Sequence, residues 1–490
     1  KESAGVDASG FPVTAVIPLP YGAYQNTDCF RLTDTNGNTV RAQFDVLNRH
    51  YSKDNSIRHL TVNFFTSAPK NGSEQFFLRD DGNGNIQGNM IVTEDSSRIT
   101  VNTGVIEFAV NKQNFSLIES LRYGEQDIII SDPLNGGVLK DRFANLQIES
   151  QMPPPQVTIE ERGPVRTVIR VELPANFRPA GQYADLVPGL DNVDVPLGEG
   201  DYTHSHGYCV RIYAYEGLSL LRVDFTLENS DKTVLQAWPL YFQEFSLGMK
   251  LPAGMDRVRI GTWNDTEGRF FTGNYLDKSD DVLAVYDQNT TTQVYISQEM
   301  HNKYTLKQED NPQTPEDESF AQTGPRGAGW LDRSDNTHGL QVAVKDFWQT
   351  WPNALEAAPD DRLVVYMFSP WARDSYCDWS NGSRYTFTDT GLYWLDDMQD
   401  VTKTYWLNAH ETLSTDELER VNALMQKNPV AVIPVEWYKE TAVTLDMSGL
   451  IPLNDNIPSS AADIWFYDEA GNIDTRFYHF GYDNYMADAG

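Results

Sequence analysis

The stretch from Gly324 to Pro370, GPRGAGWLDRSDNTHGLQVAVKDFWQTWPNALEAAPDDRLVVYMFSP, decides the fold that we predict. In its middle, Leu340, Val342 and Val344 alternate with more polar or smaller residues. This period of two is typical of a strand with one buried face, so we predict a strand from Gly339 to Asp346. The run Leu363–Phe368 is apolar throughout and predicts a second strand, covered on both faces, within Arg362–Ser369.

An aromatic segment separates these two runs. We expect its aromatic residues to fill the interior of a large β-sandwich or to line a groove on it; they are Phe347, Trp348 and Trp351. Pro352 and the turn-forming residues that end at Asp361 then redirect the chain, because proline lacks the donor that a strand ladder needs. Both runs are interpreted as central strands of a large β-sandwich.

The rest of the chain supports a mainly β fold. Leu221–Glu228 places four apolar residues in strict alternation with four polar ones, an order that an amphipathic helix does not give. We predict a small N-terminal β-barrel (residues 1–100), a large antiparallel β-sandwich (residues 101–412) and a C-terminal extension (residues 413–490). The one predicted helix begins at Ser414, where Glu417 completes a capping box, and ends at Asn428-Pro429; Pro429–Pro458 is expected to be an extended linker with short strands.

Composition excludes several classes of function. The 490 residues carry a formal net charge of -32, which argues against nucleic acid as a partner because phosphate binding needs basic patches. No apolar run approaches the roughly 20 residues that a membrane span needs. Cys29, Cys209 and Cys377 stand in no metal-ligand spacing; they allow one disulfide or three buried thiols. The acidic balance suits a secreted, extracellular or periplasmic protein, and self-assembly stays open.

Several motifs resemble a known family. Gly329-Trp330-Leu331-Asp332, followed by Gly339 and by Asp346-Phe347-Trp348-Gln349, is similar to the central sandwich domain of the exo-rhamnogalacturonan lyase and YetA-like proteins of bacteria and fungi. Ile17-Pro18-Leu19-Pro20 and Asp54 with Ser56-Ile57-Arg58 resemble the small barrel domain of that family. The chain departs from its pattern at Tyr51, at Asn55 and at Tyr405, where the family has Trp, Gly and His.

That resemblance implies a polysaccharide lyase acting on rhamnogalacturonan or ulvan. Such enzymes cleave by β-elimination: a base removes a proton at C5 while a cation or a polar group neutralises the uronate. The family has an α/α-toroid after the sandwich. Ile473–Gly490 resembles the start of that toroid, so we expect the toroid to be absent from this chain.

The first candidate site is the histidine-containing stretch Tyr202–Arg211. His204 and His206 are expected on one face of a strand, near Tyr208, as a base and a charge neutraliser or as a metal pair. The alternative is two edge-strand histidines bonded to backbone or water. Lys403 is a further candidate base, although a lone lysine on a strand is usually solvated.

The second candidate site is the aromatic loop that follows Pro370. Indole rings stack on the flat C–H faces of sugars, so we predict that Trp371 and Trp379 are saccharide platforms. Arginine binds carboxylates, so we predict that Arg373 is a carboxylate clamp, and Tyr376, between Arg373 and Trp379, is a further substrate-binding candidate. The alternative is an aromatic loop packed under the edge of the sandwich.

A third feature is the turn Asp80–Asn85. Asp81, Asn83 and Asn85 alternate as Ca²⁺ ligands do, but Ile86 stands in the glycine position, and a plain turn is the preferred interpretation. No cofactor other than this possible Ca²⁺ is expected.

Two functions therefore stay open. One is a polysaccharide lyase of the kind that the resemblance implies. The other is a non-catalytic module that binds an acidic polysaccharide or another glycan, or that serves structural assembly.

Overall fold

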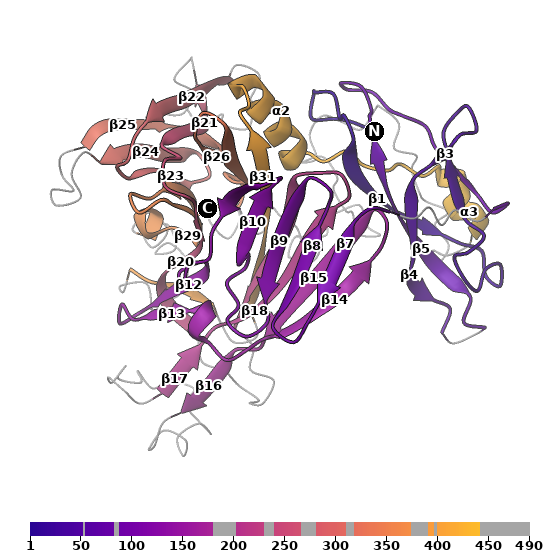
Figure 1. Cartoon of the computed structure of the whole chain (residues 1–490), viewed down its shortest axis with the longest axis horizontal. Coiled ribbons are helices and arrows are strands. Elements are labelled where there is room, and N and C mark those ends of the chain that lie inside the picture. The colour runs from indigo at the N-terminus through magenta and orange to yellow at the C-terminus, as the bar shows by residue number, and fades with distance from the viewer. Residues whose placement is uncertain are drawn as a thin grey trace, which may run out of the picture.

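The computed structural model describes residues 1–51, 54–82, 88–179, 202–229, 240–265, 281–309, 318–373, 391–395 and 399–441. These residues form a mainly β protein in which every strand pair is antiparallel, as the sequence predicts (Figure 1). A small β unit lies beside a much larger sandwich. Within these ranges no helix has both the length and the apolar character that crossing a membrane requires.

The N-terminal unit consists of two three-stranded sheets around one core. The first orders β1 (Phe11–Pro18), β5 (Ile57–Thr66) and β4 (Ala42–Arg49), and the second orders β3 (Thr39–Val40), β2 (Arg31–Thr33) and β6 (Phe77–Arg79). A turn that contains Asn36-Gly37 joins β2 to β3, with Gly37 at φ 83°, which glycine adopts without a side-chain clash. Phe30, Leu60 and Val62 lie at the centre of this core.

A five-stranded sheet follows. Its order is β11 (Gln126–Ile129), β10 (Ser120–Tyr123), β9 (Ile106–Asn111), β8 (Arg98–Asn102) and β7 (Ile91–Glu94). Because β7 and β8 pair onward to β9, this sheet runs across residue 100, where we placed the end of the first domain. Its apolar residues, Val101 and Phe108 among them, belong to the core of the sandwich.

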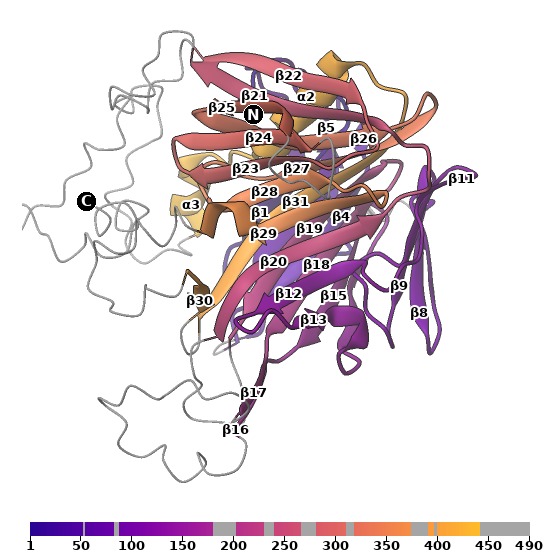
Figure 2. The same cartoon turned by 90° about the vertical axis from the view of Figure 1, so that its left-hand side faces the viewer.

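Two large sheets form the sandwich (Figure 2). The first large sheet has the order β13 (Leu146–Ile148), β12 (Gly136–Asp141), β20 (Leu240–Lys250), β29 (Arg362–Phe368), β28 (Asn353–Ala357), β23 (Val294–Met300), β24 (Lys303–Glu309) and β25 (Glu318–Gly324), and β30 (Tyr393–Leu395) also pairs with β20. The second large sheet has the order β14 (Gln156–Arg162), β15 (Arg166–Leu173), β18 (Gly207–Tyr215), β19 (Leu220–Glu228), β31 (Asp400–Glu411), β27 (His338–Val344), β26 (Arg326–Ser334), β21 (Arg257–Asp265) and β22 (Asp281–Asn289). A separate ribbon pairs β16 (Asn176–Pro179) with β17 (Tyr202–Ser205).

The stretch Gly324–Pro370 joins the two large sheets. Its strands β26 and β27 lie in the second sheet, and β28 and β29 lie in the first. The predicted strands β27 and β29 are central, but they occupy opposite sheets, and β28 falls in a segment that we predicted to be a turn. Phe347 is buried in the core between the two sheets, as a plug of the sandwich, and Trp351 is also buried.

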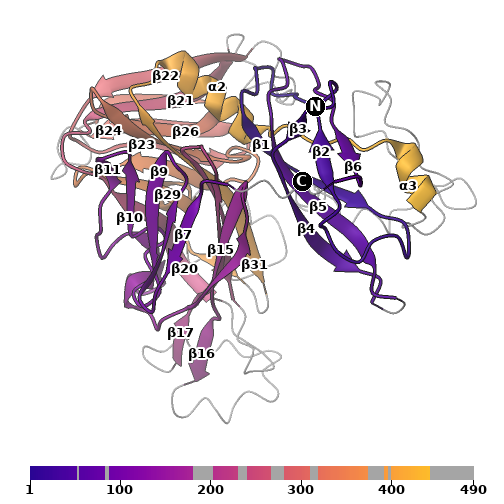
Figure 3. The ribbon, with the colours of Figure 1, turned by 45° about the vertical axis from the view of Figure 1, so that its right-hand side comes forward.

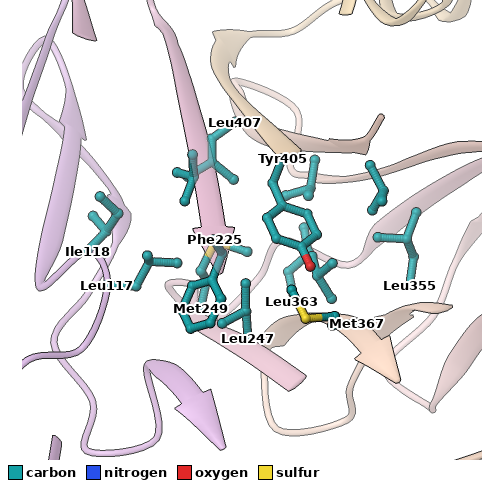
Figure 4. Packing of buried hydrophobic residues seen from close by; sticks show 14 of the residues in the cluster. Leu117, Ile118, Phe225, Leu247, Met249, Leu355, Leu363, Met367, Tyr405 and Leu407 are labelled. Carbon is teal, nitrogen blue, oxygen red and sulfur yellow. The ribbon is translucent and has the colours of Figure 1, made fainter. Parts of the chain in front are cut away.

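The inner faces of the two large sheets form one continuous hydrophobic core. Phe225, Tyr405 and Leu407 project into it from the second sheet and meet Leu363 and Met367 of the first (Figure 4). In β27, Leu340, Val342 and Val344 belong to this core, which is the face that their alternation predicts. The prediction that β29 is covered on both faces is wrong in part, because Tyr366 on its outer face is only partly buried.

Helix α2 (Thr415–Gln426) covers the other face of the second large sheet. The predicted capping box is present: Ser414 Oγ accepts from the Glu417 N–H at 3.3 Å, and the Glu417 carboxylate accepts from the Ser414 N–H at 2.9 Å. A second helix, α3 (Val435–Thr441), forms where we predicted only an extended linker. Figure 3 shows α2 against the sandwich and α3 against the N-terminal unit.

Candidate functional site

Three aromatic rings meet on the outer face of the first large sheet, and we call Trp371, Tyr295 and Tyr366 the Trp371 platform. Trp371 stacks on Tyr295 of β23, with ring centroids 3.7 Å apart and planes 5° apart. Tyr366 of β29 meets the indole edge-on at 5.1 Å. Tyr295 is buried whereas Trp371 is partly exposed, so the indole is held from behind and remains in contact with solvent.

The local sequence explains how Trp371 reaches this position. It lies in a single 3₁₀ turn, Pro370–Ala372, that begins where β29 ends. Ser369 caps the turn by accepting from the Trp371 N–H at 3.2 Å, and Pro370 supplies a backbone angle that suits the first position of a helical turn. Ser369 is itself fixed, since its Oγ lies 2.8 Å from Ser297 Oγ on β23 and its carbonyl accepts from the Tyr393 hydroxyl.

A buried carboxyl group lies beneath the platform. Tyr366 donates its hydroxyl hydrogen bond to Glu356 Oε2 at 2.6 Å, and Gln293 donates to the other oxygen. Burial raises the pKa of Glu356, which is only 4% exposed, although these two hydrogen bonds oppose the shift. Burial and the neighbouring Glu356 charge raise the pKa of the Tyr366 hydroxyl well above its usual value.

Arg373 and Glu244 add a charged group of each sign. Burial raises the pKa of Glu244 on β20, and the positive charges of Lys140 and Arg373 oppose that shift. The Nε–H of Arg373 is buried and meets no acceptor in the described part of the chain. An arginine in this state can bind an anionic or hydroxyl oxygen of a ligand, because an unpaired buried donor costs free energy until it is satisfied.

The structure thus brings Trp371 and Arg373 to the same end of the first large sheet. Tyr376 and Trp379 lie outside the described residues. Sequence reasoning missed Tyr295, Tyr366, Glu356, Glu244 and Gln293. Tyr366 was the one with a usable signal, since a tyrosine inside an apolar strand often places its hydroxyl toward a polar partner.

A lone lysine on a strand is usually solvated, but Lys403 is buried. It is 7% exposed and points into the core between the large sheets, where it donates to the carbonyl oxygens of Thr350 at 2.8 Å and Met367 at 2.9 Å. It also donates to Asn353 Oδ1. Burial lowers the pKa of Lys403 to about 7.

The histidine stretch does not form one continuous strand. His204 lies in β17, paired with Phe177 of β16, whereas His206 falls in the break before β18, which pairs with β15 and β19. The i and i+2 argument for a shared face therefore fails. His206 is fully buried, with Nδ1 3.1 Å from Gln147 Oε1.

Tyr208 is part of the core rather than of a surface groove. Its ring stacks on Phe115 at 5.5 Å, and burial raises the pKa of its hydroxyl. The nearby Glu149 is fully buried, 4.0 Å from His206 Nε2, and burial raises the pKa of Glu149 to about 8. In the described ranges, no three metal-binding side chains gather at this or another place.

The turn Asp80–Asn85 is described only as far as Gly82. Asp81 binds the Arg31 guanidinium, with both carboxylate oxygens 2.9 Å from one nitrogen, and Asp80 accepts from the Tyr24 hydroxyl at 2.8 Å. The ion pair with Arg31 thus engages Asp81, the one carboxylate among the three Ca²⁺ ligands that we considered. Asn83 and Asn85 lie outside the described residues. Cys29 and Cys209 are free thiols, and Cys377 lies outside the described residues.

Comparison with known proteins gives no family. No family model matches the chain, and no curated protein matches it. Among solved structures, a glycosyl hydrolase family 38 protein from Enterococcus faecalis has a TM-score of 0.46 at 10% identity, covering 85% of this chain and 45% of that one. An alpha-mannosidase from E. faecalis V583 gives 0.45 at 11% identity, covering 86% and 44%. A galactose 1-epimerase from Lactobacillus acidophilus NCFM gives 0.33 at 10%, covering 66% and 99%.

The chain spans less than half the length of the first two of these proteins. Likenesses at this level carry no argument about activity. The expected membership in the exo-rhamnogalacturonan lyase and YetA-like family is wrong, because no family model matches and the solved structures that resemble this chain are of other kinds.

Proposed function

We propose that this chain binds carbohydrate at the Trp371 platform. The observation that carries the proposal is the partly exposed indole of Trp371, held in place by the parallel ring of Tyr295 at 3.7 Å. A sugar ring has a flat apolar C–H face that packs on indole, and a platform that is already rigid loses little entropy when the sugar binds.

The polar groups around the platform favour an acidic sugar. Arg373 lies two residues after Trp371 in the chain, and its buried Nε–H has no acceptor among the described residues. A uronate carboxylate would satisfy that donor, and the positive charge would attract it locally against the net charge of -32 of the whole chain. Glu244 and Glu356 have pKa values raised by burial, which lessens their repulsion of the carboxylate.

Binding without cleavage is the reading that these positions support best. A β-eliminating enzyme needs a base that touches the sugar. His206, Tyr208 and Lys403, three of the bases that the sequence suggested, lie in the interior of the protein. Tyr366 lies at the platform, but its raised pKa makes it a poor base at neutral pH.

The test is a calorimetric titration of the whole chain with soluble oligosaccharides of rhamnogalacturonan, of ulvan and of a neutral mannan. Trp371→Ala should weaken binding of the best ligand about tenfold, which corresponds to about 1.4 kcal/mol of lost stacking. Trp263→Ala is the matched control, because Trp263 is exposed on β21 and lies outside the platform. Unchanged affinity in Trp371→Ala would refute the site.

The same samples test cleavage. Release of an unsaturated uronate, seen as new ultraviolet absorbance, would show that the chain is a lyase and not only a binding module. Arg373→Gln should reduce affinity for the acidic oligosaccharides and leave any affinity for the neutral mannan unchanged.

A further inference from the structure

Lys403 links the two large sheets through the middle of the core. Its backbone belongs to β31 of the second sheet, beside Tyr405, whose ring lies near Met367 in Figure 4. Its ammonium group binds three oxygens that belong to the first sheet or to the turn leading into it: the carbonyls of Met367 and Thr350 and the side-chain amide of Asn353. A charged ammonium has three N–H donors, so each donor has one acceptor.

The neighbours of this ammonium are uncharged. Phe225 of β19 lies opposite Lys403 in the strand register, and the Phe368 ring centroid lies 5.6 Å from the ammonium. Two acidic side chains on neighbouring strands are engaged elsewhere: Asp224 of β19 binds Arg222, and Glu356 of β28 binds Tyr366 on the outer face. Tyr405, two residues along β31, is the titratable side chain on its own face, and burial raises its pKa.

The cage therefore distinguishes the two protonation states of the amine. The charged form satisfies all three oxygens. A neutral amine has two donors and one lone pair, so one oxygen would lose its hydrogen bond and face a lone pair instead. Burial lowers the pKa of Lys403 to about 7, which brings this exchange near neutral pH.

The acceptors lead directly to the Trp371 platform. Met367 follows Tyr366 in β29, and Trp371 lies four residues after Met367, in the turn capped by Ser369. Asn353 begins β28, the strand that carries Glu356, and its amide also donates to the Phe347 carbonyl at 2.7 Å. The ammonium thus ties down one end of β29, which carries Tyr366, and one end of β28, which lies between β29 and β23 and carries the Glu356 that binds Tyr366.

We propose that Lys403 is a positioning residue: its charged ammonium holds the ends of β28 and β29 against β31 and so makes the geometry of the Trp371 platform depend on protonation inside the core. As pH rises past neutrality, one tie is lost and the stacked pair Tyr295–Trp371 loosens.

The first test needs no ligand. The near-ultraviolet circular dichroism of the aromatic stack, isolated by subtracting the spectrum of Trp371→Phe, should change between pH 6 and pH 9 in the wild-type protein. Lys403→Met should show no such change over this range. Lys403→Gln, which keeps two donors at every pH, is the second variant if Lys403→Met does not fold. Lys70→Met, at an exposed position, should behave as the wild type.

A pH-dependent signal that persists in Lys403→Met and Lys403→Gln would overturn the proposal and point to Glu356 instead. The wild-type signal being flat across this range would overturn it as well.

The second test rests on the proposed function. The affinity of the wild type for a rhamnogalacturonan oligosaccharide should fall about two- to tenfold between pH 6 and pH 9, the worth of one hydrogen bond, and that of Lys403→Gln should stay constant. An affinity that falls equally in both proteins would contradict the role of Lys403. If the oligosaccharide binds neither protein, the proposed function fails, while the ligand-free test still decides the role of Lys403.

Discussion

Glu149 shows what a single buried carboxyl does to this protein. It is fully buried beside β12, where Gly137 has no side chain to collide with it and donates its N–H to Oε2 at 2.7 Å. Burial raises its pKa from the ordinary 4.5 to about 8. Between these two values the folded protein keeps a proton that the unfolded chain has released, so the free energy of unfolding falls as pH rises through this window.

Glu149→Gln should remove that fall. The variant should match the wild type in stability below about pH 4.5, where the carboxyl is protonated in both states. At pH 9 it should be more stable by on the order of a few kcal/mol, at about 1.4 kcal/mol for each tenfold change in the ionisation equilibrium. Urea unfolding at a series of pH values measures this. Glu125→Gln, at a fully exposed carboxylate, is the control, and parallel pH profiles for Glu149→Gln and wild type would contradict the prediction.

At the residue scale, the sequence showed which side chains can carry protons but not whether they are buried or exposed in the fold. Lys403, His206 and Tyr208 were chosen because their side chains can carry protons, and each of the three is buried. Periodicity places Lys403 on the same face as Tyr405 and Leu407, which is the core face. It does not show that three oxygen atoms on that side accept hydrogen bonds from the ammonium. Those oxygens belong to Thr350, Asn353 and Met367, which lie 53, 50 and 36 residues before Lys403 in the chain.

Among the elements, helix α2 is the one that local signals predicted most fully. Its start and its capping box were visible in the sequence, because they depend on residues within three positions of each other. The sequence did not show which part of the sheet the helix packs against. Gln341 of β27 donates to the Leu418 carbonyl at 2.8 Å, and Gln426 of α2 donates to the Val344 carbonyl of β27 at 2.8 Å. These hydrogen bonds attach α2 to the polar face of a strand whose other face was the one predicted.

Ser414→Ala should weaken this attachment at its start. The substitution removes the acceptor for the Glu417 N–H and should cost about 1 kcal/mol of the free energy of unfolding. Thermal or urea unfolding measures the loss. Thr415→Ala, one position into the helix and outside the capping box, should cost clearly less; an equal or larger cost for Thr415→Ala would show that the box contributes nothing.

Strand identity was predictable from alternation, whereas strand order was not. The runs at β19 and β27 gave the correct buried face, since period two reports burial directly. The same reasoning missed β28, where Asn353 and Glu356 interrupt the apolar pattern because their side chains serve Lys403 and Tyr366. A strand whose buried positions hold polar residues with polar partners does not show the apolar alternation by which a strand is predicted.

At the scale of the whole molecule, the chain returns to its beginning after crossing the sandwich. Val430 exchanges two backbone hydrogen bonds with Lys1, and α3 then lies against the N-terminal unit (Figure 3). Trp437 of α3 packs on the core of that unit and donates its Nε1–H to the Pro18 carbonyl at 2.7 Å. Composition and patterning gave the two β units, but a contact between residues 18 and 437 leaves no local signal in either segment.

Trp437→Ala should therefore destabilise the N-terminal unit more than the sandwich. The indole is partly exposed, so the cost should be below the about 3–5 kcal/mol that removal of a fully buried tryptophan causes. Limited proteolysis should cut the variant faster at residues 427–434, where the backbone bonds to Lys1 depend on α3 remaining in place. Trp437→Phe keeps ring packing and loses only the hydrogen bond to Pro18, so it should lie between the wild type and Trp437→Ala. Equal cleavage of all three proteins would mean that the Lys1–Val430 pairing alone holds this segment, and that α3 follows it rather than fixing it.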